Sequence, residues 1–280
     1  MIKIKTLASA ITLTAVCSAH AVAQGLMLEE VIVTAQKRTE NLQDVPISII
    51  AISGEKVNDF AIIDLQELTT YVPNVTINNG AGTPNLFIRG VGSGTNSGFE
   101  QSVGMYVDGV YLGRGRQYRS GLMDIERIEV LRGPQGTLFG KNTVAGASNI
   151  TSASPVVGDD TSGEINVSIE ENGGSIAEGF LQGGSETFAA RIALRGRETD
   201  GYVYNAFLEQ DEGGIDEFGG RITLVWQPSD VFSANFKYSY MERERDGSNS
   251  ATWRFLSPAE RDAQVPKRSA FASTAYTMMD

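Results

Sequence analysis

Apolar and polar residues alternate with a period of two over much of the second half of the chain. Ile165, Val167 and Ile169 alternate with polar neighbours, and three later segments repeat the pattern. Successive side chains of a strand point to opposite faces, so the pattern predicts antiparallel strands with one apolar and one polar face. The later apolar positions are Phe188, Ala190, Ile192 and Leu194; Ile222, Leu224 and Trp226; and Phe232, Ala234, Phe236, Tyr238 and Tyr240. The polar face includes Arg191, Arg195, Arg197, Arg221 and Lys237.

The connections between these predicted strands differ in length. Gly184–Glu186 and Pro228–Asp230 are short turns, whereas Thr199–Asp216 is a long acidic loop. Short periplasmic turns and longer external loops are typical of outer-membrane barrels, in which the apolar face meets lipid and the polar face lines a wet lumen. A soluble sandwich has a similar apolar face, so a single strand does not distinguish the two.

Residues 41–155 have a different pattern, which predicts a compact mixed α/β domain. Asp64-Leu65-Gln66-Glu67 has the spacing of a capping box and predicts a helix over Leu65–Tyr71 that ends before Pro73. Met105–Leu112 is predicted to be a hairpin, because its central Asp-Gly pair suits a type I′ turn. Further short strands are predicted at Pro46–Ser53, Val75–Ile77, Asn85–Arg89 and Ile128–Leu131.

The first 23 residues are predicted to be a secretory signal peptide. Two lysines precede the apolar run Leu7–Ala19, and Ala21-Val22-Ala23 is a small-residue cleavage site. Cleavage there would remove Cys17 and His20, the only cysteine and histidine of the sequence. The mature chain would then have no thiol and no imidazole, which excludes Ser-His-Asp catalysis, Cys-His catalysis and the common zinc sites within it.

Charge and glycine spacing exclude two further classes of function. The formal net charge of −11 becomes −13 without the signal peptide, because two of the 23 basic residues are lost and all 34 acidic residues remain. An acidic chain is a poor nucleic-acid binder, since neutralising phosphates needs basic groups. The segment before Gly140-Lys141 is not a P-loop, because Gln135 replaces the first glycine and Asn142 the Ser/Thr.

The run Ile125–Thr143, IERIEVLRGPQGTLFGKNT, resembles the core of the plug domain of TonB-dependent outer-membrane receptors. The resemblance implies an α+β plug domain followed by the first strands of an antiparallel transmembrane β-barrel, which has about 22 strands in a full-length relative. One segment departs from the family pattern: Ser148–Pro155 is more polar than usual, which puts the strength of the last plug strand in doubt.

The resemblance also divides the chain. It implies a signal peptide (1–23), a TonB box with its linker (24–40), a plug domain (41–155) and about five or six barrel strands (156–280). A closed barrel at roughly ten residues per strand needs a longer sequence, so the chain is expected to be a fragment.

The segment ahead of the plug is short and β-prone. Such a segment can add itself as a strand to the open sheet edge of another protein, and it resembles the TonB box. The alternative is an ordinary edge strand of the following domain. The residues to which the resemblance assigns TonB binding are Glu30, Val31, Ile32, Val33, Thr34 and Ala35.

The resemblance implies two sets of site residues in the plug. Arg89 and Arg132 match plug arginines that pair with barrel glutamates and hold the plug, although arginines solvated in a wet lumen are an equal alternative. The ligand-facing positions it implies are Ser93, Asn96, Phe99, Tyr111, Arg114 and Arg116. The basic and aromatic members of this set could equally contact the barrel wall.

The function implied by the resemblance is active uptake of a scarce nutrient, first of all a ferric siderophore or similar iron complex, across the outer membrane of a Gram-negative bacterium. TonB, driven by its inner-membrane motor complex, would pull on the box and displace the plug, without covalent chemistry, cofactor or bound metal. The partners implied are TonB, outer-membrane lipid and a small-molecule or metal-chelate ligand. The alternatives are a receptor for cobalamin, haem or oligosaccharide, a passive porin, a secreted or surface β-rich adhesion module, and a carboxylate-based hydrolase.

Overall fold

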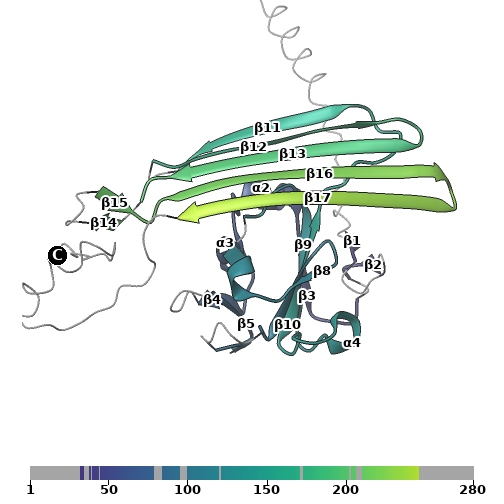
Figure 1. Ribbon diagram of the computed structural model, residues 1–280. Helices are drawn as coiled ribbons and strands as arrows, with labels where there is room; N and C mark the ends of the chain where they lie inside the picture. The colour runs from purple at the N-terminus through teal and green to yellow at the C-terminus, as the bar shows by residue number, and fades with distance from the viewer. Residues whose placement is uncertain are drawn as a thin grey trace, which may run out of the picture. The chain divides into compact units, whose positions relative to one another are not determined.

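The computed structural model describes residues 32–34, 38, 40–43, 45–78, 84–94, 100–119, 121–170, 173–201, 203–205 and 210–245. These residues form a mixed α/β region of short elements, followed by a sheet of long antiparallel strands (Figure 1). In the part of the chain so described, no helix is long and apolar enough to cross a membrane.

The mixed region is organised around a five-stranded sheet with the order β3-β9-β10-β7-β8. β10 is antiparallel to β9 and parallel to β7. Its core is apolar, and the side chains of Ile88, Val103 and Ile128 have no exposed surface. The strands are β1 (Ile32–Val33), β2 (Glu40–Asn41), β3 (Ile49–Ser53), β4 (Val75–Asn78), β5 (Asn85–Ile88), β6 (Val91–Gly92), β7 (Val103–Val107), β8 (Val110–Leu112), β9 (Ile125–Arg132) and β10 (Gly146–Ser152). The helices are α2 (Gly54–Asp59), α3 (Leu65–Tyr71), the 3-10 turn η2 (Gly115–Arg119) and α4 (Gly136–Phe139).

Helix α3 confirms the prediction made from its capping residues. The Asp64 side chain accepts hydrogen bonds from the amides of Gln66 and Glu67, at 2.8 and 3.0 Å. Glu67 reaches back in turn and accepts the Ile63 N–H at 2.7 Å, one residue before the expected position. Burial raises the pKa of the Glu67 carboxyl above its ordinary value. The helix ends at Tyr71 because the following residues lead into a proline.

The predicted β7–β8 hairpin is also confirmed. Asp108 and Gly109 both have positive φ, at 49° and 80°, as a type I′ turn requires. Asp and Gly are the residues that adopt this backbone at low cost, so the turn is determined locally.

The polar composition of the last strand of the mixed region does not prevent it from pairing on both sides. Ser148 and Ser152 of β10 are buried, and Asn149 donates a hydrogen bond to Glu129 at 2.7 Å. The Ser152 hydroxyl donates to Asp108 at 2.6 Å. Buried polar groups cost little when they are hydrogen-bonded, as Asn149 and Ser152 are, whereas the buried Ser148 hydroxyl has no hydrogen-bond partner among the described residues. A polar strand thus occupies the centre of the sheet.

The second sheet has the order β11-β12-β13-β16-β17, and every neighbouring pair is antiparallel. Its strands are β11 (Ser162–Ile169), β12 (Ser175–Gly184), β13 (Phe188–Thr199), β16 (Ile215–Ser229) and β17 (Phe232–Arg245). The long acidic loop contains a small hairpin of β14 (Val203–Asn205) and β15 (Gln210–Glu212). β11 and β17 are the edges of this sheet among the described strands, so the sheet is open.

Side-chain exposure confirms the two faces predicted for the long strands. On β13, Ile192 and Leu194 are 48% and 53% exposed, whereas Arg191 and Arg195 are 8% and 2% exposed. The apolar face is therefore outward and the polar, cationic face is covered. This is the inverse of a soluble domain and the arrangement of a barrel wall in lipid.

Candidate functional site

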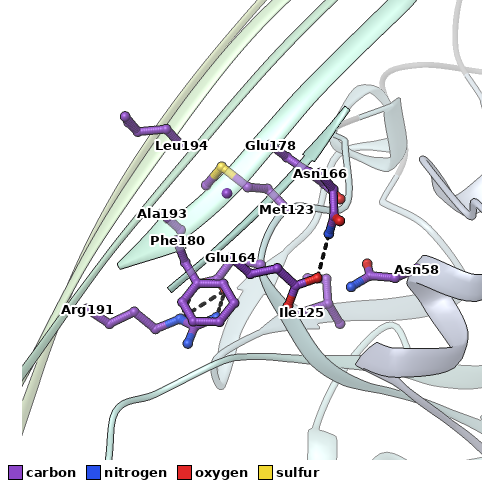
Figure 2. Close-up of a pocket in the computed structure, with 12 residues that line it drawn as sticks. Asn58, Met123, Ile125, Glu164, Asn166, Glu178, Phe180, Arg191, Ala193 and Leu194 are labelled. Carbon is purple, nitrogen blue, oxygen red and sulfur yellow. Dashed lines mark hydrogen bonds and ion pairs between the residues drawn. The ribbon is translucent and has the colours of Figure 1, made fainter. Parts of the chain in front are cut away.

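The turn that precedes β9 is held by three arginines of the long sheet. Arg191 makes a forked contact with Asp124, with its Nη2 at 2.5 Å and its Nε at 3.0 Å from Oδ1. Both side chains are nearly covered, at 9% and 5% exposure, so the pair is a desolvated, charge-assisted contact. The Arg191 guanidinium also lies over the Phe180 ring, 3.6 Å from its centroid (Figure 2).

The other two arginines donate hydrogen bonds to the backbone of the same turn. Arg221 donates to the carbonyl oxygens of Met123 and Asp124, at 2.8 and 3.2 Å. Arg195 donates to the Leu122 carbonyl oxygen. Three consecutive residues of the plug are therefore bound by cations from β13 and β16.

A buried glutamate of the sheet pairs with one of these arginines, Arg195, and with Arg243. Glu217 on β16 lies 3.4 Å from Arg195 Nε and 3.7 Å from an Arg243 nitrogen, and Arg243 in turn donates to the Arg119 carbonyl oxygen. Gly121 faces this carboxylate, and a Cβ there would collide with it. A larger residue at this position would therefore force the Glu217 side chain to shift.

A second attachment joins β17 to the β7–β8 turn. Lys237 donates to Asp108 Oδ1 at 3.0 Å, to the Ser152 carbonyl at 3.0 Å and to the Ser152 hydroxyl at 2.9 Å. Burial favours the neutral acid, but the hydrogen bonds from Ser152 and Lys237 outweigh it and lower the pKa of Asp108 below its ordinary value. The carboxylate is thus kept charged where the sheet supplies a cation.

The openings between plug and sheet have linings of mixed polarity. The cavity in Figure 2, beside the turn, has a volume of about 70 Å³, which is room for a few waters and far too little for a nutrient. A wider opening of about 590 Å³ lies between α2–α3 and strands β11–β13. It is lined by acids such as Glu67 and Glu170 and by the bases Arg195 and Arg197.

The two arginines predicted to lock the plug are placed elsewhere. Arg89 follows β5 with φ 53° and is exposed, and its amide donates to the Asn74 carbonyl. Arg132 ends β9, half-buried, and its amide donates to the Ser48 carbonyl. Among the described residues neither pairs with a carboxylate of the sheet, so the lock through Arg89 and Arg132 stays a prediction. The attachments seen have the opposite polarity, with cations on the sheet and acceptors on the plug.

The predicted TonB box is described only in part. Glu30, Val31 and Ala35 lie outside the described residues, and β1 pairs with β2 in the register Ile32↔Asn41 and Val33↔Glu40. Val33 is buried, and the Thr34 amide donates to Glu129 Oε1 at 2.6 Å. The segment is therefore docked on β9.

Three of the predicted ligand-facing residues, Ser93, Tyr111 and Arg114, have described side chains, and they lie around Glu100 and Asn142. The assignment of ligand binding to them stays a prediction. The Ser93 hydroxyl accepts the Ser102 amide at 2.6 Å and closes the base of its loop. Tyr111 packs against Tyr106, with 5.4 Å between ring centroids, and its hydroxyl accepts from Asn142 at 2.9 Å.

Of the remaining ligand-facing positions, Arg114 is exposed. It lies close enough to Glu100 to contribute to lowering the pKa of that carboxyl, for which the larger causes are hydrogen bonds from Asn142 and Lys141. Asn96 and Phe99 lie outside the described residues, as does the side chain of Arg116 in η2.

Only one side of the contact between plug and sheet could be predicted from the sequence. Alternation placed Arg191, Arg195, Arg221 and Lys237 on the polar face, but it named no partners for them. Asp124 was not singled out, because its role depends on the turn and not on a motif. The available signal was the repetition of bases at inward positions on three strands. Among the described residues, no group of three or more acidic, histidine or cysteine side chains could hold a metal ion.

Comparison with known proteins agrees with this geometry. Residues 41–147 match the family model of the TonB-dependent receptor plug domain. The pesticin receptor of Yersinia pestis is 27% identical over 68% of this chain and 28% of its own length. The iron-regulated outer membrane virulence protein of Vibrio cholerae is 34% identical over 50% of this chain and 22% of its own length.

A solved structure agrees on the fold. The ferric yersiniabactin uptake receptor FyuA from Yersinia pestis superposes with a TM-score of 0.62 at 24% identity, covering 70% of this chain and 32% of that one. The chain thus spans less than a third of the length of these relatives. Residues 41–147 therefore belong to the plug-domain family of TonB-dependent receptors, and the outward-apolar antiparallel strands that follow and bind this domain are arranged as in the outer-membrane receptors to which the chain is similar.

Proposed function

We propose that this chain provides the plug and the adjoining barrel wall of a receptor that takes up a scarce nutrient across the outer membrane. A ferric siderophore or similar iron complex is the substrate class that we favour, because one relative is named as iron-regulated and the solved relative as a ferric yersiniabactin receptor. Cobalamin, haem and oligosaccharide are the alternative substrates. No covalent step is needed for this activity.

The observation that best supports the proposal is the chemistry of the plug–sheet contact. The plug has its own apolar core, which includes Ile88, Val103 and Ile128. Its contact with the sheet is instead made by cations on carboxylates and carbonyls, as at Arg191–Asp124 and Lys237–Asp108. Water can replace such contacts one at a time, so the plug can move against the wall without losing its core.

The energy for that movement would come from TonB. A β-prone segment can pair with an open sheet edge, and main-chain hydrogen bonds across the direction of pull can bear load. We assign this role to Glu30–Ala35, behind a signal peptide over 1–23 that directs the chain to the periplasm. The plug would then extend over 41–155, with wall strands from 156 onward.

Uptake measurements test the proposal. The receptor, as encoded by its gene, would be produced in cells that lack their own receptors and supplied with radiolabelled ferric siderophores, haem and cobalamin in turn. We expect accumulation of one ligand, and loss of that accumulation on deleting Glu30–Ala35, while surface binding persists. Uptake that survives the deletion would show a passive pore, and binding of none of these ligands would contradict the nutrient class.

A further inference from the structure

A buried carboxylate in the middle of the plug receives the N-terminal segment. Glu129 lies in β9 and has no exposed surface. Its Oε1 accepts the Thr34 N–H at 2.6 Å and the Arg127 Nε at 3.3 Å, while its Oε2 accepts Asn149 Nδ2 at 2.7 Å. Three donors from three segments of the chain therefore converge on two oxygens.

The side chain of Thr34 is held as well. Arg127 Nη2 donates to the Thr34 hydroxyl at 2.6 Å, and the same guanidinium pairs with the carboxylate of Glu126. The pairing of β1 with β2 covers two residues on each strand, which is too short to fix a segment by itself. The contacts at Thr34 are thus the stronger hold on this part of the chain.

Undocking the segment has a defined cost. If Thr34 leaves, the buried Glu129 carboxylate loses a charge-assisted hydrogen bond that water must replace in a covered site. A partner that binds only the undocked segment must overcome this cost, and its apparent affinity falls in proportion to the undocked fraction.

We propose that Glu129, supported by Arg127, is the docking site of the N-terminal segment and a positioning residue that limits how often residues 32–34 are available to pair with TonB. The inference rests on the proposed function for the identity of the partner.

Thiol accessibility tests the docking without reference to TonB. Cys17 is the only cysteine of the sequence and lies in the predicted signal peptide, so a Val33→Cys receptor would present one thiol. Its alkylation by a maleimide would be timed in isolated outer membranes, alone and combined with Glu129→Gln. We expect the rate to rise roughly tenfold in the combined variant, because glutamine offers one neutral acceptor in place of two charged oxygens.

Two controls make the result specific. Glu186→Gln makes the same change at an exposed acid in the turn between β12 and β13, outside the docking site, so the rate should not change. An Ala147→Cys receptor reports on the buried centre of the plug sheet and should stay unreactive with Glu129→Gln. Equal rates at position 33 with glutamate or glutamine at 129, or a rise at both 33 and 147, would overturn the docking role.

Binding of the purified periplasmic domain of TonB separates this inference from the proposed function. We expect tighter binding to the Glu129→Gln receptor than to the unmodified one, and no change with Glu186→Gln. If the thiol becomes accessible but TonB binds neither receptor, the docking site stands and the TonB assignment fails. If TonB binds all three receptors equally and the thiol rates are equal, the TonB assignment stands and the docking site fails.

Discussion

Both sheets of this chain place apolar and polar side chains on opposite faces, but they direct those faces differently. In the plug, Ile88 and Ile128 are fully buried, whereas in the long sheet Ile165 and Ile169 are more than four-fifths exposed. The long sheet instead covers Arg195 and Thr223. The plug is therefore organised by removing apolar surface from water, and the wall by presenting it to lipid. Where the plug and the wall meet, the contact is polar and can open. We call this contact the joint: it consists of Arg191, Arg195 and Arg221 on the turn at residues 121–125, and of Lys237 on Asp108.

The joint is where we expect the largest effect. Asp124→Asn keeps a residue that tolerates φ 53° but leaves the covered Arg191 cation without its counter-charge. The free energy of opening the turn at residues 121–125 should fall by about 3–5 kcal/mol, as when one partner of a buried pair is removed. Amide hydrogen exchange of that peptide measures it. Asp159→Asn, a change at an exposed acid, should leave the exchange rate of that peptide unchanged. Equal protection of the peptide in both variants would contradict the role of Asp124 in holding the turn.

The second prediction concerns the apolar core of the plug and compares a buried isoleucine of the plug with an exposed one of the wall. Ile128→Ala should destabilise the plug by about 2–5 kcal/mol, because it leaves a cavity at a position with no exposed surface. The matched change Ile165→Ala, on an exposed wall position, should not alter plug stability. Urea dependence of proteolytic cleavage within the plug gives both values. A similar loss from both changes would mean that the plug does not have a core of its own.

Adjacent residues of β17 test the two faces of the wall. Phe236→Arg places a cation on the outward face and should cost about 2–4 kcal/mol if that position lies near the membrane midplane. Asn235→Arg, one residue away on the inward face, should be tolerated. Folding yield into lipid vesicles, followed by heat-dependent gel mobility, measures the difference. Equal tolerance would place this strand outside lipid.

These regions also differ in how far the sequence could predict them. Helix α3 and the Asp108-Gly109 turn were predicted because capping residues and a positive-φ pair act locally. β12 gave no clear alternation, since glycines occupy several of its positions, and its place is decided by pairing with β11 and β13. Helix α2 was not predicted either, because its cap is the single Ser53 side chain.

The joint could be predicted only from one side. The inward arginines follow from period-two alternation, but three of their four acceptors in the turn are backbone carbonyls, which every residue has. Such partners have no sequence signature and depend on how β9 enters its sheet. The ion pairs predicted for Arg89 and Arg132 remain untested, because their partner glutamates were expected in strands beyond those described.

The smallest effect we predict concerns the Lys237 attachment and its dependence on pH. Asp108 has a pKa below its ordinary value of 3.8, so it binds its proton more weakly when the plug is docked than when it is unfolded. Its contribution is therefore complete above pH 3.8 and is lost as the pH falls through the lower, folded value. At neutral pH, Asp108→Asn should weaken the attachment by about 1.5–3 kcal/mol, the range for hydrogen bonds to charged groups.

Exchange of the amides around residues 106–110 measures this attachment from pH 6 downward. The difference between the Asp108→Asn and unmodified receptors should shrink as the acid is protonated. A double-mutant cycle with Lys237→Met isolates the pair, because its coupling energy should vanish at the same low pH. Coupling that persists there would mean that Ser152, which bonds to both residues, holds the turn without help from charge. The joint would then open by breaking neutral contacts, and only the Arg191–Asp124 attachment would remain electrostatic.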